Sequence, residues 1–156
     1  MLVIGQIVEV EVSSVAVFGI FCRYNEQEVL VLIPETSWIA SYCSCHQFTE
    51  PGDRFKVKVI HVDTDTGKVS ASIKALHPDP WNSSLLEPGI VHRARVVRQV
   101  DKADRCNDRP GYLLELVPGG YVMVYADGLA FDKNQRLKVT IRDSDFSKRA
   151  VRVAVE

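Results

Sequence analysis

The chain has 156 residues, 46% of them hydrophobic, which fits one medium domain or two small ones and excludes wholesale disorder. No apolar run is long enough to cross a bilayer and the N-terminal residues form no basic leader, so we expect a cytoplasmic protein. The formal net charge of −1 argues against a strongly nucleic-acid-binding chain, but residues 1–80 carry −4 and residues 81–156 carry +3, which suggests two units with different surfaces.

The first half consists of short alternating apolar runs separated by turn signals, a pattern typical of β-strands in a barrel or sandwich. The expected strands cover residues 6–15, 18–24, 28–34, 54–63 and 68–76. A tight turn is predicted at TDTGK, residues 64–68. Residues 37–53 form a longer excursion, with room for a short helical turn, that ends at Pro51 and Gly52.

The second half repeats this order, with strands expected at residues 89–100, 111–117, 121–126, 136–143 and 149–155. The spacing supports a duplication, because Gly5 and Gly89 are 84 residues apart, while RFKVKVI at 54–60 and RLKVTIR at 136–142 are 82 apart. We therefore predict an all-β chain of two tandem five-stranded barrels. The expected domains are residues 1–77 and 89–156, joined by a linker at 78–88.

The linker is rich in proline, which cannot continue a central strand, and it contains Trp81. The indole either fills the gap between the two barrels or offers a surface for base stacking. The first alternative is favoured, because large aromatic side chains dominate such contacts.

Two phenylalanines in VAVFGIFCRY, residues 15–24, pose a problem of geometry. Phe18 and Phe21 are three residues apart, so in a regular strand they would point to opposite faces. A bulge or bend at Gly19 would reset the alternation and place both rings on the outside. The alternative leaves Phe21 in the core and only Phe18 exposed.

Residues 4–76 resemble the S1 RNA-binding domain, named after a ribosomal protein and also present in polynucleotide phosphorylase. The resemblance rests on GQIVEVEV, VFGIF, VLIPETSW and, most specifically, GDRFKVKVIHVDTDTGKVSASIK. The following PDPW resembles the linker between repeats of that ribosomal protein. The resemblance implies an OB barrel that binds single strands on its outer face.

Carried over residue by residue, the family's nucleic-acid contacts are Phe18, Phe21, Asp63 and Lys68. The family's histidine at the end of the third strand is absent, because Pro34 stands there. This departure puts affinity or base preference in doubt, but not the fold. Lys68 either contacts a phosphate or is a solvated turn lysine. The alternating Arg54, Lys56 and Lys58 form a basic stripe that is either a binding surface or the wet side of a strand.

The second half departs further from the family pattern, with Pro110 and Leu113 in place of the two rings. Tyr112 and Tyr125, together with Arg93 and Arg95, form a secondary candidate site. Tyr121 adds aromatic surface. The half is rich in arginine, which suits phosphates and stacks on bases. The arginines are Arg93, Arg95, Arg98, Arg105, Arg109, Arg136, Arg142, Arg149 and Arg152. They either bind phosphates, solubilise the surface or pair with the acidic first half.

No constellation of residues indicates catalysis, a cofactor or a metal. Cys43, Cys45 and His46 lack the spacing and the partner pair of a structural zinc site. In the expected cytoplasmic setting these cysteines, with Cys22 and Cys106, are predicted to be free thiols. No phosphate-binding glycine loop or dinucleotide fingerprint is present.

The sequence thus predicts a non-catalytic protein that binds single-stranded RNA, with single-stranded DNA as a possible substitute. Stacking comes mainly from the first barrel and phosphate contacts from the second. The alternative is a protein-interaction module with little RNA affinity, docked on a ribosomal, polymerase or RNA-processing protein. The near-neutral charge and the missing histidine favour the alternative, whereas the aromatic segment and Lys68 favour RNA.

Overall fold

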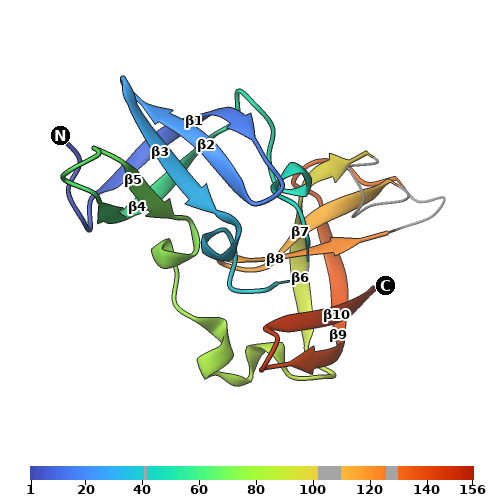
Figure 1. Cartoon of the computed structure of the whole chain (residues 1–156). Coiled ribbons are helices and arrows are strands. Elements are labelled where there is room, and N and C mark those ends of the chain that lie inside the picture. Colours follow the sequence, from blue (N-terminus) through green and yellow to red (C-terminus); the bar gives the residue numbers. More distant parts are fainter. Residues whose placement is uncertain (41, 102–109, 126–129) are drawn as a thin grey trace.

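The computed structural model describes residues 1–40, 42–101, 110–125 and 130–156, and within them the chain is all-β (Figure 1). The first half holds β1 (Ile7–Val15), β2 (Gly19–Tyr24), β3 (Gln27–Leu32), β4 (Arg54–Val62) and β5 (Val69–Ser72). The second half holds β6 (Val91–Val100), β7 (Gly111–Val117), β8 (Gly120–Val124), β9 (Arg136–Asp145) and β10 (Ala150–Val155). Short 3-10 helices connect them: η1 (Ile33–Glu35), η2 (Cys45–Gln47), η3 (Lys74–Leu76), η4 (Pro80–Asn82) and η5 (Ser84–Leu86). No helix in the described ranges is long and apolar enough to cross a membrane.

The first five strands close into a barrel in the order β1-β2-β3-β5-β4. Alternate residues of β1 point inward, and Val8, Val10 and Val12 are buried while the residues between them are exposed. The predicted strands are found within a few residues of their expected ends. The main exception is β5, the last strand of the barrel, which was predicted to reach Leu76 but ends at Ser72. The chain continues from there into η3.

The second five strands form a sheet in the order β10-β9-β6-β7-β8, which is the same strand order as in the barrel. The predicted fold of two five-stranded OB-like units is therefore confirmed. The second unit differs in one respect, because its described strands β8 and β10 are not hydrogen-bonded to each other, so this sheet does not close completely.

Equivalent backbone contacts mark the two units as repeats. Gly5 and Gly89 both have φ of 92°, a conformation that favours glycine. The Gly5 N–H donates to the Val59 carbonyl at 2.8 Å, and the Gly89 N–H donates to the Ile141 carbonyl at 2.7 Å. The two acceptors are 82 residues apart, which matches the spacing of the sequence repeat.

Strand β7 is buried on both of its faces. Tyr112, Leu114 and Leu116 point into the core of the second sheet. Leu113, on the other face, joins the core of the first barrel, as does Tyr121 of β8, whose ring centroid lies 5.0 Å from that of Phe48. The outer face of β7 and β8 is therefore covered by the first barrel.

The loop after η1 completes the contact between the two units. Ile39 is fully buried in the core of the second sheet. The Trp38 N–H donates to the Gly119 carbonyl at 2.8 Å, and the Ala40 N–H donates to the Arg149 carbonyl at 2.7 Å. Because side chains of each half complete the core of the other, the domain boundaries at residues 77 and 89 stay a prediction.

Trp81 of η4 lies between the two units, as predicted. Its Nε1–H donates to the Trp38 carbonyl at 2.6 Å, and its ring packs edge-on against Phe146 of the β9–β10 turn at 6.0 Å. This contact explains an aromatic residue in a proline-rich linker.

The cysteines only partly match the prediction of free thiols. Cys22 and Cys45 are free and sealed in the core of the first barrel. Cys43, which is exposed, is disulfide-bonded, so the prediction of a free thiol is wrong there. Cys106 lies outside the described residues.

Candidate nucleic-acid interface

Phe18 and Phe21 lie together on the outside of the first barrel. Phe18 is 55% exposed and Phe21 is partly exposed. Their ring centroids are 6.0 Å apart and the rings meet edge to face, at 88°. The two rings therefore share one outer surface, as the sequence predicted.

Of the two predicted causes, the bulge is wrong, because β2 contains none, whereas the bend is confirmed: the backbone bends at Val17 and Phe18, directly before Gly19. The pairing of β2 with β3 is continuous from Gly19, and the irregularity lies across the sheet in β1, between Val12 and Ser14. Phe18 instead precedes the strand, in a turn closed by the Ala16 N–H and the Gly19 carbonyl at 2.9 Å.

Gly19 also contributes space. A Cβ at this position would lie 3.2 Å from Leu30 Cδ1 and 3.3 Å from the Val31 carbonyl oxygen. Gly19 and Phe21 share one side of β2, because alternate strand residues point the same way. A residue without a side chain at this position therefore leaves room beside Phe21.

A row of outward positions continues from Phe21 across three further strands. Phe21 pairs with Leu30 of β3, Leu30 pairs with Ser70 of β5, and Ser70 pairs with His61 of β4. Leu30 and Ser70 are partly exposed and His61 is exposed. Sequence reasoning missed these three residues, although strand alternation places each of them opposite the core positions.

Asp63 shapes the β4–β5 turn. Its Oδ1 accepts hydrogen bonds from the N–H groups of Asp65 at 2.9 Å and Thr66 at 3.2 Å. The hydrogen bonds from the Thr66 and Asp65 backbones lower the pKa of this carboxyl group. Asp63 is thus engaged in holding the turn, and the exposed Lys68 follows it.

The turn at 63–68 is fixed against the end of the β2–β3 hairpin. The side-chain amide of Gln27 donates to the Gly67 carbonyl at 3.1 Å. Phe18, Phe21, Asp63 and Lys68 therefore lie on adjoining strands and turns of one barrel. The two rings lie at one end of the row of outward positions, and Lys68 is two residues before Ser70, the member of the row that belongs to β5.

Two of the three cations in the predicted basic stripe on β4 lie opposite acidic residues of β1, whereas Lys58 lies opposite Ile7. Arg54 and Lys56 pair in register with Glu11 and Glu9 of β1, and Arg54 Nη2 lies 3.1 Å from Glu11 Oε1. The stripe therefore belongs to a mixed-charge surface.

The secondary candidate site is not assembled. Tyr112 is only 6% exposed and its hydroxyl accepts from the Phe131 N–H at 3.2 Å, so its assignment to a stacking surface is wrong. Tyr121 is also buried, because the first barrel covers it. Tyr125 is partly exposed, and its ring lies so close to Gly111 that a Cβ there would be 2.9 Å from Tyr125 Cδ1.

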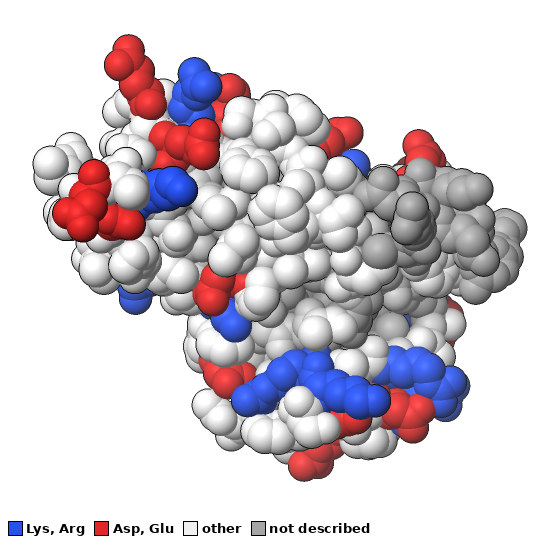
Figure 2. Space-filling model, in the orientation of Figure 1, with Lys and Arg blue, Asp and Glu red and all other residues white. Residues whose placement is uncertain are grey.

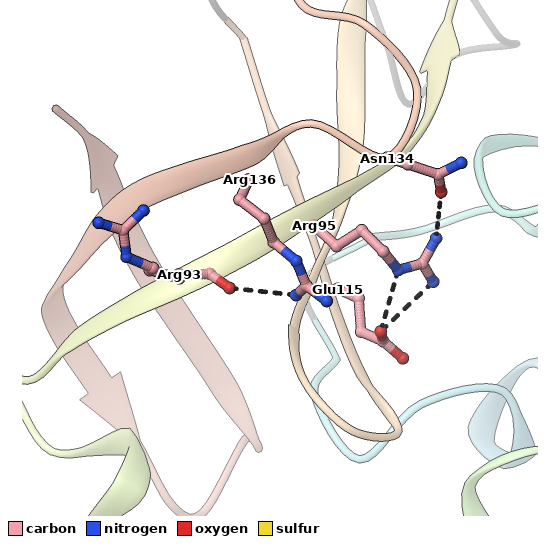
Figure 3. Close-up of polar contacts among 5 residues, drawn as sticks. All are labelled: Arg93, Arg95, Glu115, Asn134 and Arg136. Carbon is pink, nitrogen blue, oxygen red and sulfur yellow. Dashed lines mark hydrogen bonds and ion pairs between the residues drawn. The ribbon is translucent and has the colours of Figure 1, made fainter.

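The arginines of β6 differ in how strongly they are engaged (Figure 3). Arg95 is held by Glu115, at 3.3 Å, and by Asn134 Oδ1, at 3.0 Å. The side chain of Arg93 is exposed, and its carbonyl accepts from Arg136 Nη1 at 3.4 Å. The guanidinium of Arg95 is thus engaged by its neighbours, whereas the charged side chains of Arg93 and Arg136 are exposed to solvent.

Pairing with the acidic first half, one of the alternatives that the sequence left open, applies to Arg98 but not to Arg152. Arg98 reaches the first half, with Glu50 at 3.5 Å and the His46 carbonyl at 3.2 Å, whereas Arg152 pairs with Asp143 inside the second half. Figure 2 shows Lys and Arg side chains gathered over β9 and β10. Arg105 and Arg109 lie outside the described residues. Within the described ranges, no group of three or more His, Cys, Asp or Glu side chains could hold a metal ion.

Known proteins resemble this chain in sequence. The family model of the S1 RNA binding domain matches residues 2–74. A small ribosomal subunit protein bS1 homolog of Bacillus cereus is 26% identical over 97% of this chain and 41% of its own length. A polyribonucleotide nucleotidyltransferase of Streptococcus mutans is 37% identical over 51% of this chain and 11% of its own length.

The solved structure of GSP13 from Bacillus subtilis is 28% identical, with a TM-score of 0.46, over 50% of this chain and 62% of that chain. The chain thus spans less than half of the length of the two curated relatives named above. The family match supports nucleic-acid binding in general terms. The model of the S1 RNA binding domain thus matches the first barrel, and the described strands of the second sheet repeat its strand order.

Proposed function

We propose that this protein binds single-stranded RNA without catalysing a reaction, and that bases stack on Phe18 and Phe21 of the first barrel. The observation that carries the proposal is the exposed pair of rings on the outer face of an S1 domain. Stacking on a protein aromatic ring contributes about 1–3 kcal/mol per base and tolerates any base.

The rest of the face fits a weak, sequence-tolerant interaction. Leu30 and His61 continue the row beyond Phe21, and Lys68 offers a cation at the adjoining turn. Pro34 supplies no side-chain hydrogen bond where the family has a histidine. We therefore expect dissociation constants in the micromolar range or weaker. A log–log salt slope between about −0.7 and −2 would correspond to one to three neutralised phosphates.

The second half is proposed to contribute phosphate contacts, not stacking. In the second half, the outer face of β7 and β8 corresponds to the ring-bearing face of the first barrel. It packs on the first barrel, where Leu113 is fully buried. Exposed cations such as Arg93 and Arg136 remain on the surface of the second half. Single-stranded DNA is expected to bind in the same way, because stacking and phosphate contacts do not require a 2′-hydroxyl.

A second candidate function is protein docking, and one observation favours it. Val17, Phe18 and Leu32 are exposed at 48%, 55% and 41%, and they lie beside one another at the start of β2 and the end of β3. Such an apolar patch suits a partner protein as well as a base. Docking on it would depend little on salt, whereas RNA binding weakens as salt rises.

The test is an anisotropy titration of labelled oligo-uridine at several salt concentrations with wild type, Phe18→Ala and Phe21→Ala. We expect each variant to bind about fivefold or more weakly, because each loses one stacking surface. Leu85→Ala, which removes an exposed apolar side chain from η5, is the matched control and should bind like wild type. Unchanged binding by the two ring variants would contradict the proposal.

A further inference from the structure

A cavity of about 380 Å³ lies where the two units meet. On the first half it is lined by η1 and the residues that follow, including Pro34 and Trp38, and by Lys74 of η3. On the second half it is lined by Lys148 and Arg149 of the β9–β10 turn. Its volume is within the range of small-molecule sites. We call it the junction cavity.

The charge in the junction cavity has one sign. Lys74, Lys148 and Arg149 are cationic, and no described lining residue is acidic. The Lys74 ammonium lies 4.7 Å from the centre of the Trp38 ring. An anionic ligand would therefore meet several cations and no opposing carboxylate on the described walls.

Arg149 is the most unusual of these residues. Its guanidinium lies 4.0 Å from the ring centre of Phe146, and its Nη1 is buried without a hydrogen-bond partner among the described residues. Buried donors are nearly always satisfied, and the described residues offer this one no acceptor. Arg149 also has φ of 55°, whereas the equivalent position of the first repeat, 82 residues earlier, is Gly67 with φ of 73°. An arginine is thus kept at a position whose backbone favours glycine.

The apolar side chains that line the junction cavity indicate which chemical group would be attached to a bound anion. Trp38 offers an indole surface, and Ile33, Pro34 and Ile39 are apolar. The cavity also begins beside the stacking rings, because the Ile33 N–H donates to the Phe18 carbonyl at 2.8 Å. Arginine recognises phosphate through its planar fork. We propose that the junction cavity binds a nucleotide, with the phosphate at Arg149 and Lys74 and the planar base against the apolar wall.

The nucleotide is either a unit of the RNA strand that leaves the ring-bearing face or a free mononucleotide. The strand-bound case rests on the proposed function, whereas binding of a free nucleotide does not. The cavity would recognise a strand-bound nucleotide and a free nucleotide through the same groups. None of these groups belongs to the row of outward positions that starts at Phe21.

The test uses intrinsic fluorescence, because the two tryptophans of the chain, Trp38 and Trp81, both lie at this junction. The full chain is titrated separately with uridine monophosphate, uridine and octauridine. Arg149→Gln and Lys74→Gln remove a cation from the cavity. Arg142→Gln removes an exposed arginine from β9 and is the matched control. Thermal unfolding establishes that each variant is folded, and Lys74→Gln carries the test if Arg149→Gln is not.

We expect octauridine or uridine monophosphate to change the emission, uridine to change it far less, and both cavity variants to bind about tenfold more weakly. Arg142→Gln should bind uridine monophosphate like wild type, because Arg142 does not line the junction cavity. Dependence on Arg149 with octauridine alone assigns the strand as the source, and dependence with the mononucleotide alone assigns a free nucleotide. No response to either phosphate ligand, or equal binding by the cavity variants, would overturn the proposal. Phe18→Ala separates the two proposals, because it should leave mononucleotide binding unchanged.

Discussion

Phe18 and Phe21 reach the same surface from different backbone environments. Phe21 is an outward residue of a regular strand, whereas Phe18 belongs to the turn before it. Gly19 between them has no side chain to separate the rings, which meet at 6.0 Å. The two rings already pack against each other without a ligand, so part of the cost of ordering them for stacking is met in the free chain.

The buried thiols give a prediction at the same scale. Burial raises the pKa of both Cys22 and Cys45 to about 12. Only about one thiol in ten thousand is then ionised at pH 8, and the thiolate is the reactive form. We expect iodoacetamide at pH 8 to leave both residues unmodified in the folded protein and to modify both in denaturant, as measured by peptide mass spectrometry. Rapid modification of either thiol in the folded chain would show that the barrel core is not sealed.

At the scale of elements, the β7–β8 turn joins the two units. Gly119 has φ of 77°, and a Cβ there would lie 3.0 Å from His77 Cβ and 3.1 Å from Trp38 Cδ1. Its carbonyl accepts from the Trp38 N–H. The turn thus needs glycine both for its conformation and for the close approach of the first half.

Gly67 provides a matched comparison, because its φ of 73° is similar but a Cβ added there would meet nothing within 4 Å. We predict that Gly67→Ala lowers the free energy of unfolding by about 1–2 kcal/mol, the cost of the left-handed conformation alone. Gly119→Ala should lower it by about 3 kcal/mol, because crowding adds to that cost. Chemical denaturation measures both values, and equal losses would mean that the junction yields without strain.

The strands were predictable from sequence because alternation and turn residues are local signals. The role of β7 was not: GYLLELV is apolar on both faces, but only the tertiary structure shows that the first barrel covers one of them. The same cause made Tyr112 and Tyr121 look like surface residues. Among the candidate site residues, sequence resemblance pointed to the rings and the turn. Arg149 was one of nine arginines in the second half and did not stand out among them, because its cavity is lined by both halves.

At the scale of the whole molecule, the two halves share their cores. Ile39 of the first half is fully buried in the core of the second sheet, and Leu113 of the second half is fully buried in the core of the first. Stability is therefore a property of the whole chain and not of either half.

We accordingly predict one cooperative unfolding transition. Tryptophan fluorescence, which reports on the junction, and far-ultraviolet circular dichroism, which reports on all strands, should give the same midpoint. Ile39→Ala should lower the free energy of unfolding by about 2–5 kcal/mol and shift both probes together. Two separate transitions, or a shift in one probe only, would show that the halves unfold independently.

Binding of RNA to the ring-bearing face of the first barrel can be tested directly by a nuclear magnetic resonance titration of the labelled chain with oligo-uridine. We expect the largest shifts on Phe18, Phe21 and their neighbours along the row through Leu30, Ser70 and His61. The outer face of β7 should stay unaffected, because the first barrel covers it. Shifts confined to the second half, or none at Phe18 and Phe21 under saturating RNA, would contradict the account.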